Sequence, residues 1–241
     1  IDLCLFDTPV HRMMLFRDIN AKFVLGFNKW SCINHYSYSI AFENGKEHVT
    51  QAISLVANHM GIKFTSSQAY DLHIPDAIVN EVKSYLNVWD DRVKVIINAF
   101  TGSSERNFSQ EQLSNIIDML NKKSRNINII ILDHRKELTI SLPDNVITNP
   151  FMSLHHVMAL ISEADFIISP DTSIVHISAA WEKPLISVYK DVVDNNDLWA
   201  PGYENASQII VHNRKISNVD EVPNLIFHEI NRRGFLGGVR A

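Results

Sequence analysis

The stretch from Ala164 to Val188 constrains the fold most, because it predicts a strand, a helix and a second strand in succession. An apolar run ends in the turn Ser169-Pro170-Asp171, and a second apolar run begins at Leu185. We expect Pro170 to stop the first strand and Asp171 to cap the helix, since proline cannot donate to a ladder and aspartate is a favoured N-cap. Strands joined by a helix in this way are the unit from which parallel α/β sheets are built.

The start of this helix has the chemistry of an anion site. Thr172 and Ser173 place two hydroxyls beside the unpaired N–H groups of the first turn, where the helix dipole also favours negative charge. His176 lies four residues after Thr172 and therefore shares the face above the site. A phosphate or carboxylate is the expected ligand, although an ordinary capped crossover with a structural His176 fits the same residues.

Strand-like and helical segments alternate along the rest of the chain. The apolar strand segments are nearly continuous, as is typical of parallel strands covered on both faces. Strands are predicted at residues 1–6, 23–25, 93–98, 127–132, 146–147 and 208–211, and helices at 11–18, 48–60, 77–86, 109–120, 153–161 and 218–230. Ser109 with Gln112 predicts a capping box at the start of the helix at 109–120, and Asn218 with Glu221 can cap the last helix. The alternation predicts an α/β protein with parallel sheets.

The loop after the strand at 93–98 is the second candidate site. It contains small and hydroxyl residues that let a ligand approach the backbone, and a permanent cation suited to phosphate. These residues are Thr101, Ser103, Ser104 and Arg106. Because ligands bind at the carboxyl ends of parallel strands, we expect this loop to lie beside the turn at Asp171.

Composition narrows the class of protein. The chain of 241 residues is 46% hydrophobic and 20% charged, which is ordinary for a globular protein. A net charge of -5 argues against general nucleic-acid binding. Cys4 and Cys32 have neither a disulfide framework nor metal-ligand spacing, so we expect a reducing compartment, the cytoplasm, and no metal. No apolar run approaches the roughly 20 residues that span a bilayer.

The central motif resembles a known signature. Asp171-Thr172-Ser173-x-x-His176-x-x-Ala179-Ala180-x-x-x-Pro184 is similar to the signature Asp-Thr/Ser-Gly-x-x-His-x-x-Ala-Ala-x-x-x-Pro of the family 9 glycosyltransferases, the heptosyltransferases of the lipopolysaccharide inner core. Six of the seven fixed positions match. Ser173 replaces the usual Gly, and Lys190 stands where the family normally has a Gly after the strand.

The resemblance implies a GT-B fold of two Rossmann-like domains. Residues 1–88 would be the remainder of an incomplete N-terminal acceptor-side domain, because the chain opens on the strand-like run Ile1 to Phe6 without an initiator Met. Residues 89–217 would form the donor-binding domain, and residues 218–241 a C-terminal helix and tail that pack back on the fold.

The resemblance also implies an activity: inverting transfer of heptose from ADP-heptose to the lipopolysaccharide inner core, without a cofactor. The donor's diphosphate would be bound by Arg106, by the hydroxyls of its loop and by the helix start, while Asp171 and His176 would shape the pocket. Glu137 is the candidate ribose ligand, with Asp133 second, although a solvated charged loop at 133–137 fits these residues at least as well. The general base is expected upstream of residue 1, so no catalytic residue is assigned. The partners would be the nucleotide-sugar donor and the lipopolysaccharide core acceptor, with peripheral contact at the inner membrane.

Two other functions remain open. Ser173 and Lys190 permit a nucleotide-sugar binding module that has lost catalysis. A different GT-B-like enzyme, such as a nucleotide-sugar epimerase, is the other alternative, and it predicts binding of uridine rather than adenine nucleotides.

Overall fold

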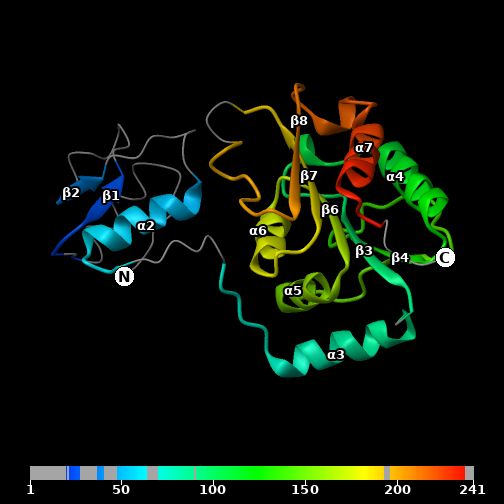
Figure 1. Cartoon of the computed structure of the whole chain (residues 1–241), viewed down its shortest axis with the longest axis horizontal. Coiled ribbons are helices and arrows are strands. Elements are labelled where there is room, and N and C mark those ends of the chain that lie inside the picture. Colours follow the sequence, from blue (N-terminus) through cyan, green and yellow to red (C-terminus); the bar gives the residue numbers. More distant parts are fainter. Residues whose placement is uncertain are drawn as a thin grey trace. The chain divides into compact units, whose positions relative to one another are not determined.

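The computed structural model describes residues 20, 22–27, 37–40, 48–63, 70–89, 91–192 and 196–236. The chain divides into two compact units, which Figure 1 draws with the elements labelled. The first unit comprises residues 1–68 with 197–199, and the second comprises 69–196 with 200–241. The domain boundaries expected after residues 88 and 217 remain predictions.

The first unit contains a short parallel strand pair and a helix. Strand β1 (Leu25–Phe27) pairs with β2 (Tyr38–Ile40), and α2 (Val49–His59) follows. The strand predicted at 23–25 therefore lies two residues later. A capping box starts α2, because the side chain of His48 accepts from Thr50 N and the side chain of Gln51 accepts from His48 N. The elements predicted at 1–6 and 11–18 lie outside the described residues.

The second unit is built on a parallel sheet of six strands in the order β5-β4-β3-β6-β7-β8. This order corresponds to the doubly wound Rossmann arrangement, in which two halves diverge from a central pair of strands. The central pair here is β3 and β6. The strands are β3 (Val93–Asn98), β4 (Ile127–Leu132), β5 (Val146–Thr148), β6 (Phe166–Pro170), β7 (Leu185–Lys190) and β8 (Ala206–Val211).

Helices cover both faces of this sheet (Figure 1). Successive strand residues point to opposite faces, so Val95 and Ile97 of β3 enter one core while Ile96 enters the other. One face carries α4 (Gln110–Lys123) and α7 (Val222–Arg233). The other carries α3 (Asp76–Leu86), α5 (Leu154–Glu163) and α6 (Ser173–Ala180). Burial on both faces explains the continuous apolar runs in the sequence.

Local sequence signals set the start of α4 but not that of α7. Helix α4 begins with the predicted capping box, in which Ser109 Oγ accepts from Gln112 N at 3.0 Å and Gln112 Oε1 accepts from Ser109 N at 2.9 Å. The expected cap of α7 by Asn218 is wrong. Asn218 ends the 3-10 turn η4 (Ile216–Asn218), and α7 starts after Glu221 without a side-chain cap. Among the described residues, no helix is both long and apolar enough to cross a membrane.

Candidate functional site

The candidate site lies where the strand order of the second unit reverses. Strands β3 and β6 are neighbours, yet the chain continues from them toward opposite edges of the sheet. In open parallel sheets, ligands bind outside the carboxyl ends of the strands at such a point. The loop after β3 and the turn after β6 are the two segments that sequence analysis singled out.

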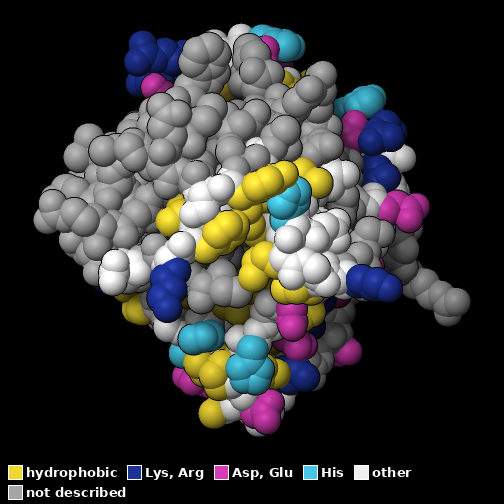
Figure 2. Space-filling view, turned by 90° about the vertical axis from the view of Figure 1, so that its left-hand side faces the viewer, with side chains coloured by type: hydrophobic (Ala, Val, Ile, Leu, Met, Phe, Trp, Pro, Cys, Tyr) yellow, Lys and Arg dark blue, Asp and Glu magenta, His cyan; other side chains and the backbone are white. Residues whose placement is uncertain are grey.

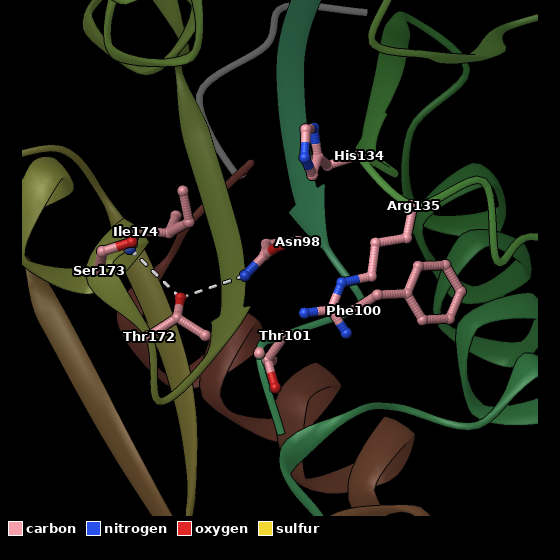
Figure 3. Close-up of a pocket in the computed structure, with 9 residues that line it drawn as sticks. Asn98, Phe100, Thr101, His134, Arg135, Thr172, Ser173 and Ile174 are labelled. Carbon is pink, nitrogen blue, oxygen red and sulfur yellow. Dashed lines mark hydrogen bonds between the residues drawn. The ribbon is translucent and has the colours of Figure 1, made fainter. Parts of the chain in front are cut away.

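A buried hydrogen-bond network joins the ends of these two strands. Asn98, the last residue of β3, is 5% exposed, and its Nδ2 donates to Ser169 Oγ and to Thr172 Oγ1, each at 3.1 Å. Thr172 Oγ1 also accepts from Ile174 N at 3.2 Å, so Thr172 is the N-cap of α6. Figure 3 shows both contacts of Thr172. The network fixes the start of α6 against β3.

Thr172, and not Asp171, therefore caps the helix, which corrects the prediction. Strand β6 includes Pro170, and the backbone N–H of Asp171 still donates to Val188 O of β7 at 3.0 Å. The helix accordingly begins one residue later than expected. The carboxylate of Asp171 has a different role, because its Oδ2 accepts from Arg106 Nη1 at 3.3 Å.

Ion pairs tie the β3 loop to the neighbouring strand ends. Arg106 ends the 3-10 turn η3 (Ser104–Arg106), and its side chain is 32% exposed in the pair with Asp171. Glu105 pairs with Lys190 at the end of β7 and with Arg214 at 3.3 Å. Hydrogen bonds from Lys190 and Arg214 hold the pKa of Glu105 below its usual value. Lys190, which departs from the family pattern, thus anchors this loop.

A cavity of about 220 Å³ opens between the two strand ends (Figure 3). It is lined by polar groups, small residues, the first turn of α6 and one arginine, and its lining includes no carboxylate. The lining residues are Asn98, Phe100, Thr101, Gly102, His134, Arg135, Thr172, Ser173 and Ile174. Such a lining is suited to an anion.

The predicted site residues are only partly brought together by this cavity. Thr101, Thr172 and Ser173 line it. Ser103, Ser104, Arg106, Asp171 and His176 are not among its lining residues. The hydroxyl of Thr101 donates to Ser103 O at 2.7 Å and accepts from Ser103 N at 3.0 Å, so it shapes the loop. The hydroxyls of Thr101 and Thr172 are therefore already engaged in hydrogen bonds within the protein.

A second cavity of about 330 Å³ adjoins the first and shares five lining residues with it, among them Asn98 and Ser173. It extends past the ends of β4 and β5 to the start of α5, where the wall becomes apolar. The remaining lining residues are Leu132, Asp133, Asn149, Phe151, Met152, Ser153, Leu154 and Val157. This wall was not predicted from the sequence, because its residues come from three segments and no motif links them.

Aromatic contacts fix Phe151 in the wall of the larger cavity. Its ring stacks on His156 with centroids 4.6 Å apart, and the ring of Tyr85 meets it edge-on at 5.2 Å. Met152 and Leu154 are 65% and 61% exposed, and they line the same cavity. Figure 2 shows that hydrophobic side chains on one face of the molecule lie among histidines and charged groups. The larger cavity thus offers an aromatic and aliphatic surface of the kind that binds a planar ring.

The two candidates for ribose binding differ in position. Glu137 forms an ion pair with Arg135 at 3.9 Å and is not among the residues that line the two cavities. Asp133 lines the larger cavity, but its two carboxylate oxygens accept from the backbone N–H groups of Glu137 at 2.8 Å and Leu138 at 3.1 Å. Asp133 therefore also holds the shape of the loop after β4.

His176 has a specific partner in the segment before α3. Its Nδ1 lies 3.0 Å from the hydroxyl of Tyr70, and the two rings are 5.4 Å apart. Burial raises the pKa of Tyr70, which keeps the phenol neutral. Within the described parts of the chain, no group of three or more His, Cys, Asp or Glu side chains is arranged to hold a metal ion.

Comparisons with known proteins identify the family. The model of glycosyltransferase family 9 (heptosyltransferase) matches residues 10–225. An Escherichia coli (strain K12) protein named "Putative lipopolysaccharide heptosyltransferase 4" is 27% identical over 213 residues, which cover 86% of this chain and 58% of that protein. The chain thus spans less than two thirds of this relative.

Solved structures show the same fold. The chain superposes on Escherichia coli ADP-heptose lps heptosyltransferase II with a TM-score of 0.70 at 12% identity, covering 94% of this chain and 74% of the other. Against Escherichia coli heptosyltransferase WaaC with ADP, the TM-score is 0.58 at 20% identity, covering 82% and 60%. The α/β fold of GT-B type expected from the sequence is therefore confirmed. Because the family model matches most of its length, this chain belongs to glycosyltransferase family 9, the heptosyltransferase family.

Proposed function

We propose that this chain carries the donor site of a heptosyltransferase that transfers heptose from ADP-heptose to the lipopolysaccharide inner core with inversion. One observation carries the proposal: an anion-suited cavity adjoins an aromatic and aliphatic cavity at the point where the sheet order reverses. A nucleoside diphosphate has two parts that match them, a charged diphosphate and a planar base whose faces stack on apolar surfaces. Family membership supports heptose as the transferred sugar.

We propose a position in the two cavities for each part of the donor. The diphosphate would occupy the smaller cavity, beside the first turn of α6 and the loop after β3. The base would lie against Phe151 and Met152 in the larger cavity, and the ribose near Asp133 at the end of β4. Glu137, on the same loop, stays a proposed ribose ligand.

In the proposed reaction the protein stabilises a leaving group. As the bond to the sugar breaks, negative charge grows on the departing diphosphate, and fixed dipoles and cations aimed at that charge lower the barrier. Residues Thr101, Ser103, Ser104, Arg106, Thr172 and Ser173 would provide this environment, with Asp171 and His176 shaping its border. We assign no general base among the described residues. Transfer also requires a general base that deprotonates the acceptor hydroxyl.

The proposal includes the partners. The acceptor would be the lipopolysaccharide core, reached by peripheral contact with the cytoplasmic face of the inner membrane, and no cofactor would be needed. Leaving-group stabilisation by the protein itself is sufficient in principle for transfer from an activated donor.

Calorimetric titration with ADP and with UDP tests the donor site. We expect ADP to bind more tightly than UDP, and Arg106→Ala to weaken ADP binding about tenfold or more, as loss of one charge-assisted hydrogen bond implies. The variant also leaves the Asp171 carboxylate without this partner, which repels the diphosphate further. Arg232→Ala is the matched control, because Arg232 pairs with Glu229 on α7.

The outcomes separate the candidate functions. Failure of the folded wild-type chain to bind ADP would refute the donor site. A preference for UDP would instead favour a different nucleotide-sugar enzyme such as an epimerase. Unchanged ADP affinity in Arg106→Ala would remove Arg106 from the site while leaving the cavity assignment in place.

A further inference from the structure

We propose that Arg135 is a second cation for the donor's diphosphate, acting from the wall of the cavity opposite the start of α6. This inference rests on the proposed function, since it presumes that a nucleoside diphosphate occupies the two cavities. Arg135 is not one of the site residues predicted from the sequence, and it stands in a charged loop after the strand at 127–132.

Arg135 lies in the wall of the smaller cavity. The residue follows β4, the neighbour of β3 in the sheet, and it lines the smaller cavity but is not among the residues that line the larger one. Figure 3 shows its side chain reaching into the cavity, with the guanidinium directed toward Thr101. The adjacent residue His134 lines both cavities, and Asp133 lines only the larger. Within three positions the loop therefore passes from the larger cavity, at Asp133, to the smaller cavity, at Arg135.

The ion pairs of Arg135 and Arg106 differ in strength. Arg135 pairs with Glu137 at 3.9 Å, and the two side chains are 59% and 35% exposed. Exposed ion pairs of this length contribute little, so this pair is readily given up. Arg106 is in the opposite situation, because Asp171 holds it at 3.3 Å and is only 17% exposed. Neighbouring carboxylates therefore neutralise the charge of Arg135 less than that of Arg106.

The start of α6 forms the opposite wall of the smaller cavity. There Thr172 and Ser173 present the first turn of α6, whose unpaired N–H groups and dipole attract an anion. A diphosphate between this turn and Arg135 would receive donors from two sides. The guanidinium is suited to this position, because it can donate two parallel hydrogen bonds to phosphate oxygens.

The two cavities make the inference testable with ligands of different length. Adenosine can occupy only the base and ribose positions, whereas ADP also reaches the smaller cavity. We would titrate adenosine and ADP into the wild-type chain and into Arg135→Gln, Arg135→Lys and Arg125→Gln. Arg125 is the matched control, because it is exposed before the start of β4, at the opposite end of that strand, and its replacement removes the same charge.

We expect Arg135→Gln to lower ADP affinity about tenfold or more while adenosine affinity changes less than about twofold, since the lost interaction is charge-assisted. Arg135→Lys should lie between, because lysine keeps the charge and loses the bidentate geometry. Arg125→Gln should match the wild type. Circular dichroism would verify that each variant is folded.

Equal ADP affinity in the wild type and Arg135→Gln would overturn this proposal alone. An equal loss for adenosine and ADP would also overturn it, because it would place Arg135 beside the nucleoside. Absence of ADP binding to the wild-type chain would overturn the proposed function itself, and this inference with it.

Discussion

Replacement of Thr172 by valine removes a hydroxyl from the network at the strand ends while keeping the size of the side chain. The hydroxyl accepts hydrogen bonds from Ile174 N at 3.2 Å and from Asn98 Nδ2 at 3.1 Å, and it lies 3.2 Å from Ser169 Oγ. Loss of an N-cap costs about 1 kcal/mol, and loss of a further buried hydrogen bond about 0.5–1.5 kcal/mol. We therefore expect Thr172→Val to lower the free energy of unfolding by about 2 kcal/mol, a large part of a typical total of about 5–15 kcal/mol.

Urea unfolding of the chain measures this change as a shift of the midpoint at constant slope. Thr172→Ser is the matched control, because serine keeps the hydroxyl and should stay within about 0.5 kcal/mol of the wild type. Combining Thr172→Val with Asn98→Ala isolates the contact between the two side chains, whose coupling should be about 1 kcal/mol.

Two results would refute the reasoning. If Thr172→Val unfolds within about 0.5 kcal/mol of the wild type, the hydroxyl does not cap α6 as the structure indicates. If Thr172→Ser is as unstable as Thr172→Val, keeping the hydroxyl does not preserve stability, and the hydrogen bonds do not explain the effect. In either case the start of α6 would need another account.

Three further predictions concern the neighbourhood of the site and the core. Gly102→Ala should leave the thermal midpoint within about 1 °C, because its Cβ would meet no atom within 4 Å, yet weaken ADP binding in a titration, since Gly102 lines the smaller cavity. Because the pKa of Glu105 is lowered, its ion pairs stabilise the fold at pH values above 4.5, the usual pKa of the group. This contribution is lost as the pH falls through the folded pKa, so Glu105→Gln should flatten the acid limb of a plot of the unfolding midpoint against pH. Gln112→Leu should cost about 2–4 kcal/mol in urea unfolding, because Ser109 N loses the Oε1 acceptor and the carbonyls of Ile216 and Val219 each lose the Nε2 donor, keeping one backbone N–H.

Local signals in the sequence predicted the central elements well. The bounds of β3 and β4 were predicted to the residue, because both strands are apolar on two faces, Asn98 ends the first and Asp133 follows the second. The capping box of α4 was predicted for a similar reason, since its two partners are three residues apart. Such signals depend on residues close in the chain, and a single sequence contains them.

The start of α6 was predicted one residue early because it depends on strand pairing. Pro170 ends β6 as expected, but it does so as the last residue of the strand, in register with Val188 of β7. A proline lacks only the N–H group, and its carbonyl and its place in the register are unaffected. The pairing of β6 with β7 then decides which residue caps the helix, and a local motif does not contain that information.

The two arginines show where prediction of the site from sequence ends. Arg106 was the natural choice for a phosphate ligand because it stands in a small-residue loop after a strand, and the sequence cannot show that Asp171, 65 residues away, holds its guanidinium. Arg135 was overlooked because it stands among other charged residues, where a solvated loop is the usual outcome. The strand order distinguishes them: β4 lies beside β3, so the loop after β4 reaches the same cavity as the loop after β3. If Arg135→Gln weakens ADP binding while adenosine binding is kept, sheet order together with cavity lining will have located a phosphate ligand that motif spacing did not.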